Sequence, residues 1–116
     1  MKYDNSAYEQ EVLRSIGSTV AAFEGGVEEG CVFRDDTYPF LGLSGEVGEV
    51  LELVKKAWRK GEQNWMNHID QDRVIDELGD VLWYVVRCAR VAGCDFQTLM
   101  ELNLEKLGKR RAERGA

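Results

Sequence analysis

The chain has 116 residues, of which 44% are hydrophobic and 31% charged, a composition typical of one globular domain large enough to bury a core. The formal net charge of −6 argues against general binding to nucleic acids or to anionic membranes, because their phosphates would repel the protein. The sequence shows no apolar run of about 18 residues and no signal-like segment, so we expect a single cytoplasmic domain over residues 1–116.

The first predicted helix covers residues 5–23, where apolar residues recur at helical spacing. Asn5 or Ser6 can cap its start and Gly25 can end it. We expect this helix to cover the core of the domain. From Gly25 to about Pro39 the periodicity is lost, which predicts a surface loop.

A second helix is predicted from about residue 38 or 40 to residue 59. Gly42, Gly45 and Gly48 form a stripe of small residues, which favours close packing of another helix over room for a ligand. The helix ends in the basic segment KKAWRKG, whose cations suit the negative end of the helix dipole. Lys56 follows Glu49 by seven residues and lies on the same side of the helix, so it is a better candidate than Lys55 for binding phosphate. Trp58 either packs on the core or stacks on a base.

A third helix begins at His68 or Asp70 and runs to about Ala92, where Gly93 ends it. Its many apolar residues predict that it is the most buried helix, with Cys88 in the core. A fourth helix follows Asp95 as its N-cap and begins at Phe96. Four helices with short connections predict an all-α, antiparallel four-helix bundle-type core.

Two acidic pairs distinguish the second and third helices: Glu46 with Glu49, and Glu77 with Asp80. Within each pair the residues are three positions apart, which places both carboxylates on one side of a helix. Carboxylates in apolar surroundings are costly unless a cation neutralises them, and an all-oxygen set suits Mg²⁺ or Mn²⁺. The simpler alternative is that these acids face water at the edge of each apolar stripe. The repetition of the pair in successive apolar helices favours the metal site.

The segments GEVGEV, DELGDVLWYV and NLEKLGKRR resemble the MazG-like all-α nucleoside triphosphate pyrophosphohydrolase family over about residues 38–111. Gly45 stands where many members carry an additional Glu. The resemblance implies attack at the α-phosphorus of an NTP or dNTP, giving the monophosphate and pyrophosphate. It also implies that Asn103, Lys106 and Arg110 contact the triphosphate.

In this reading Glu46, Glu49, Glu77 and Asp80 hold the metal, and Glu46 or Glu49 accepts a proton from the attacking water. Trp58, Trp65 and the loop aromatics Phe33 and Tyr38 are candidates for contact with the base. The short chain and the resemblance both predict a homodimer or homotetramer. Two alternatives stay open: a phosphoribosyl-ATP pyrophosphohydrolase, and a non-catalytic acidic helical module that binds a basic partner.

Overall fold

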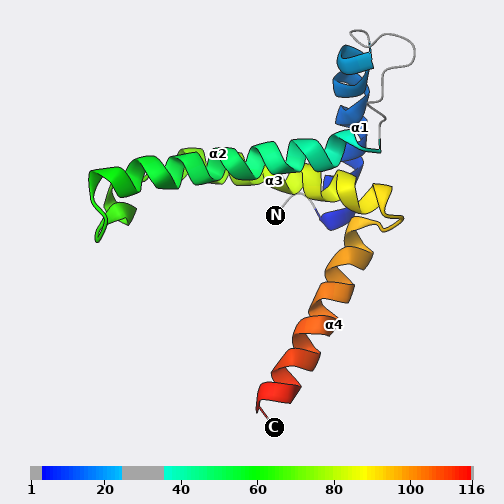
Figure 1. The fold of residues 1–116 in the computed structure, drawn as a ribbon. Coiled ribbons are helices and arrows are strands. Elements are labelled where there is room, and N and C mark those ends of the chain that lie inside the picture. The colour runs from blue at the N-terminus through cyan, green and yellow to red at the C-terminus, as the bar shows by residue number, and fades with distance from the viewer. Residues whose placement is uncertain (1–3, 25–35, 116) are drawn as a thin grey trace. The chain divides into compact units, whose positions relative to one another are not determined.

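The computed structural model describes the backbone of residues 4–24 and 36–115, and the side chains of residues 4–15 and 36–115 (Figure 1). All regular structure in these ranges is helical, which confirms the predicted all-α class. The described chain forms two compact units. One contains α1, the end of α3 and α4, and the other contains α2, η1 and most of α3. Cys31, Phe33 and most of the predicted loop lie outside the described residues.

The second of these units is a helical hairpin. It consists of α2 (Tyr38–Lys60), the short 3₁₀ helix η1 (Trp65–Asn67) and α3 (Gln71–Val91), with α2 and α3 side by side (Figure 1). Pro39 lies in the first turn of α2, where its missing N–H costs nothing. The carboxylate of Asp70 accepts a hydrogen bond from the backbone N–H of Arg73 at 3.2 Å, which caps the start of α3. The helix boundaries therefore agree closely with the sequence prediction.

Close contact between α2 and α3 depends on Gly42. A Cβ at this position would overlap the ring of Tyr84 on α3, whereas a Cβ at Gly45 or Gly48 would meet nothing within 4 Å. The Tyr84 ring also lies 6.3 Å from the ring of Tyr38, centroid to centroid. The predicted close packing is therefore found at Gly42, while the two later glycines border open space.

The end of α3 is well defined. Gly93 has φ of 85°, the N–H of Cys94 donates to the carbonyl of Ala89 at 2.8 Å, and the N–H of Gly93 donates to Arg90 at 3.0 Å. This is the Schellman arrangement, which needs one residue in the left-handed conformation, and glycine adopts that conformation without strain.

Cys88 is buried as predicted, and burial raises the pKa of its thiol. The buried residues of α3 lie in its last turns, from Val86 to Ala89. They outnumber the buried residues of α2 and of α4, in agreement with the prediction that this helix is the most buried.

The other unit joins α1 (Asn5–Glu24) to α4 (Phe96–Gly115) through one buried carboxylate. Glu9 accepts hydrogen bonds from the backbone N–H of Phe96 at 2.9 Å and from Nε of Arg90 at 3.0 Å. Asp95 caps the start of α4, as predicted, by accepting a hydrogen bond from the backbone N–H of Thr98 at 2.8 Å. Hydrogen bonds from the side chain and then the backbone of Thr98 lower the pKa of Asp95. Among the described residues, no helix is long and apolar enough to cross a membrane.

Candidate metal centre

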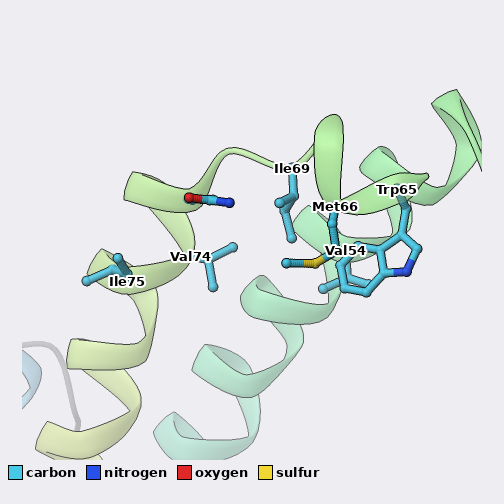
Figure 2. A pocket seen from close by; sticks show the side chains of 7 residues that line it. Val54, Trp65, Met66, Ile69, Val74 and Ile75 are labelled. Atoms are coloured by element: carbon cyan, nitrogen blue, oxygen red, sulfur yellow. The ribbon is translucent and has the colours of Figure 1, made fainter.

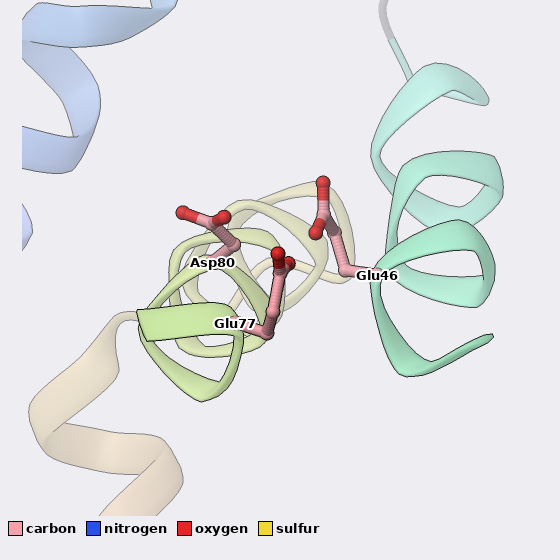
Figure 3. Close-up of side chains that lie close together, drawn as sticks. All are labelled: Glu46, Glu77 and Asp80. Carbon is pink, nitrogen blue, oxygen red and sulfur yellow. The ribbon is translucent and has the colours of Figure 1, made fainter. Parts of the chain in front are cut away.

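Carboxylates from α2 and α3 converge in the middle of the hairpin (Figure 3). Glu46 on α2 and Glu77 and Asp80 on α3 each offer one oxygen atom, and these atoms all lie within 4.8 Å of one another. Glu46 and Glu77 are half-buried, and Asp80 is exposed. The helical spacing of Glu77 and Asp80 puts both on the side of α3 that faces Glu46. We call these three residues the acidic cluster.

Two oxygen atoms of the acidic cluster are buried without a partner. Oε2 of Glu46 and Oε2 of Glu77 are shielded from solvent and accept no hydrogen bond from any described residue. Buried acceptors are normally satisfied, so an unsatisfied pair in one place needs a physical explanation. A hard divalent cation would satisfy both, because Mg²⁺ and Mn²⁺ prefer carboxylate oxygens. The donor set therefore fits such an ion.

Glu49 completes the set of four predicted carboxylates. Its side chain is exposed and lies beside Glu77 rather than within the acidic cluster. The pKa of Glu77 is raised to about 7, first because its protonated form donates a hydrogen bond to Glu49, and further because of burial and the nearby charges of Glu49 and Glu46. Burial likewise raises the pKa of Glu46, with added repulsion from Glu49 and Asp80. Without a cation, Glu77 is therefore partly protonated near neutral pH.

A groove opens beside Glu49, with a volume of about 470 Å³. Its lining combines residues of both helices: Gly45, Gly48, Glu49, Glu52, Leu53, Lys56 and Arg73. We call it the Lys56–Arg73 groove. Lys56 is exposed here, on the same side as Glu49, as the sequence predicted. Arg73 was not among the site residues predicted from the sequence, although its position four residues before Glu77 places it on the same side of α3.

An apolar pocket of about 290 Å³ lies near the turn between α2 and α3 (Figure 2). It is lined by Val54, Trp65, Met66, Ile69, Gln71, Val74 and Ile75. Val54 of the pocket and Lys56 of the groove are two residues apart on α2, so they point to opposite sides of that helix. The same holds on α3 for Ile75 of the pocket and Arg73 of the groove. The apolar pocket and the Lys56–Arg73 groove therefore open on different sides of the hairpin.

The other predicted substrate contacts have different settings. Trp58 is 48% exposed, so it does not pack in the core of the hairpin, and contact with a base stays a prediction. Asn103, Lys106 and Arg110 are exposed on α4, which belongs to the other unit, and their contacts to a triphosphate also stay predictions. His68 is exposed at the end of η1, outside the acidic cluster.

Comparison with known proteins identifies the family. The gene 37 protein of Mycobacterium phage L5 is similar to this chain, with 37% identity over 75 residues, a match that spans 65% of each protein. No solved structure matches the chain at a significant level. Residues 39–114, which include both acidic pairs, match the MazG nucleotide pyrophosphohydrolase domain. The chain with this carboxylate hairpin thus belongs to the MazG nucleotide pyrophosphohydrolase family.

Proposed function

We propose that the protein is a Mg²⁺-dependent nucleoside triphosphate pyrophosphohydrolase that converts an NTP or dNTP to the monophosphate and pyrophosphate. The observation that carries this proposal is the convergence of Glu46, Glu77 and Asp80, each with an oxygen within 4.8 Å of the others. Family membership supports the reaction class. The two buried, unsatisfied carboxylate oxygens support a resident cation.

In this proposal Glu46, Glu77 and Asp80 would hold the cation, and Glu49 lies at the edge of the acidic cluster. A divalent ion there supplies charge neutralisation for the triphosphate and makes a water molecule more acidic. Glu49 is better placed than Glu46 to accept the proton of the attacking water, because it is exposed and lies outside the acidic cluster. Attack at the α-phosphorus then breaks the bond to the bridging oxygen, and pyrophosphate leaves.

The direct test is to incubate the protein with dNTPs and Mg²⁺ and to identify the products. Release of pyrophosphate and monophosphate in equal amounts supports the proposal, and orthophosphate release without pyrophosphate contradicts it. Mn²⁺ should also support activity, since it accepts the same oxygen ligands. Including canonical dNTPs, modified dNTPs and phosphoribosyl-ATP in one assay would identify the preferred substrate.

The proposed enzyme is a homodimer or homotetramer. Large apolar side chains remain exposed on one side of the hairpin: Val47, Leu51, Ile75, Leu78 and Leu82. Contiguous exposed apolar surface is typical of a protein interface. Light scattering coupled to size exclusion should give a mass of two or four chains. Replacing Leu51 and Leu78 with Gln should shift the protein toward the monomer, whereas a wild-type monomer would contradict this part of the proposal.

A further inference from the structure

Arg73 is a cation with no role in the proposed function, which assigns roles only to carboxylates. It lines the Lys56–Arg73 groove together with Lys56, and its guanidinium has no ion-pair partner among the described residues. Lys56 also has no such partner, whereas its neighbour Lys55 pairs with Glu52 at 3.6 Å. Two unpaired cations from different helices thus face one groove.

The position of this groove relative to the acidic cluster follows from helix geometry. Arg73 precedes Glu77 by four residues on α3, about 6 Å along the axis. Lys56 follows Glu49 by seven residues on α2, about 10 Å along the axis. Because α2 and α3 are antiparallel, both displacements point toward the η1 end of the hairpin (Figure 1). The two cations therefore lie on the same side of the acidic cluster and at the same end.

The floor of the groove is shaped by glycine. Gly45 and Gly48 line it, and a Cβ at either position would meet nothing within 4 Å. The backbone of α2 is therefore accessible to a ligand beside Glu49. The groove volume of about 470 Å³ leaves room for a hydrated polyphosphate. The planar fork of Arg73 suits two oxygens of one phosphate group, and the ammonium of Lys56 suits a point charge.

We propose that Arg73 and Lys56 form a pyrophosphate subsite in the Lys56–Arg73 groove, which binds the β- and γ-phosphates of the substrate and then the leaving pyrophosphate. This inference rests on the proposed function, in which the acidic cluster would hold a divalent cation beside the groove. It adds Arg73 as a binding residue and assigns the distal phosphates to the η1 side of the cluster.

The test measures binding of inorganic pyrophosphate in the presence of Mg²⁺, by calorimetry, to the wild type and to Arg73→Gln. We expect the variant to bind pyrophosphate at least about tenfold more weakly, the typical effect of losing a charged hydrogen bond. Arg73→Lys should recover part of the affinity. Arg59→Gln is the matched control, because Arg59 is exposed on the same hairpin but does not line the groove.

Mg²⁺ alone separates this binding role from a structural one. The rise in melting temperature on adding Mg²⁺ should be equal in the wild type and in Arg73→Gln, which shows that the acidic cluster is intact. Wild-type affinity in Arg73→Gln, or an equal loss in Arg59→Gln, would overturn the subsite. Failure of the proposed function would look different, because the wild type would then release no pyrophosphate from any dNTP.

Discussion

Gly42 lies directly against the ring of Tyr84, and this contact sets how closely α2 approaches α3. Gly42 precedes Glu46 by one turn, and Tyr84 follows Asp80 by one turn. The contact is therefore adjacent to the acidic cluster in both helices. The separation of the two helices here determines whether oxygens from α2 and α3 can reach a common ion.

Gly42→Ala should destabilise the protein, because the added methyl group overlaps the Tyr84 ring. Overpacking of this kind costs about 1–3 kcal/mol in free energy of unfolding. Gly45→Ala is the control, since its Cβ meets nothing and the better helix propensity should stabilise by up to about 1 kcal/mol. Thermal denaturation compares the two. Equal stability of both variants would show that α2 and α3 are not in close contact.

The stability of the metal-free protein should fall as the pH rises from about 5 to about 7. The pKa of Glu77 is raised from its ordinary value of 4.5 to about 7, so between these values the folded state binds more protons than the unfolded chain. Glu77→Gln should remove this decrease. Chemical denaturation in EDTA across this pH range measures it, with Mg²⁺ added in a parallel series. A slope that is unchanged in Glu77→Gln would contradict the assignment.

Glu49→Gln and Asp80→Asn should each lower pyrophosphate release by at least about a hundredfold, more than the loss typical of groups that only orient metal ligands. Neither change should destabilise the metal-free protein, because each removes negative charge from a crowded group. Activity and melting temperature are measured together. Glu62→Gln, at an exposed site outside the cluster, should behave as the wild type. A large fall in melting temperature for the first two variants would indicate structural ion pairs instead.

Glu9→Ala should destabilise the protein by about 2–3 kcal/mol. The change removes the carboxylate that accepts two hydrogen bonds, so the N–H of Phe96 and the Nε–H of Arg90 lose their acceptor. Glu11→Ala, which breaks an exposed ion pair with Arg14, should cost less than about 1 kcal/mol. Urea denaturation distinguishes these values. Equal effects would mean that the Glu9 contacts add nothing beyond a surface pair.

The sequence by itself determined the helices and gave four candidate metal-binding carboxylates, of which the structure brings Glu46, Glu77 and Asp80 together. Local features are sufficient for these predictions: Asp70 and Asp95 cap helix starts, Gly93 ends a helix, and residues three apart share one side of a helix. The two acidic pairs also predicted a cation site, because two pairs of carboxylates in successive apolar helices are energetically costly without a cation. The helix ends and the shared side within each acidic pair depend only on neighbours within one or two turns.

Only the tertiary structure decided which groups from different helices meet. Whether Glu46 reaches Glu77 depends on the spacing between α2 and α3, which the Gly42–Tyr84 contact sets. The same packing brings Arg73 into a groove with Lys56, although the two are 17 positions apart in the chain. Helical periodicity gives the direction of a side chain from its own axis. It cannot give the register or distance between two axes, because these depend on how side chains interdigitate.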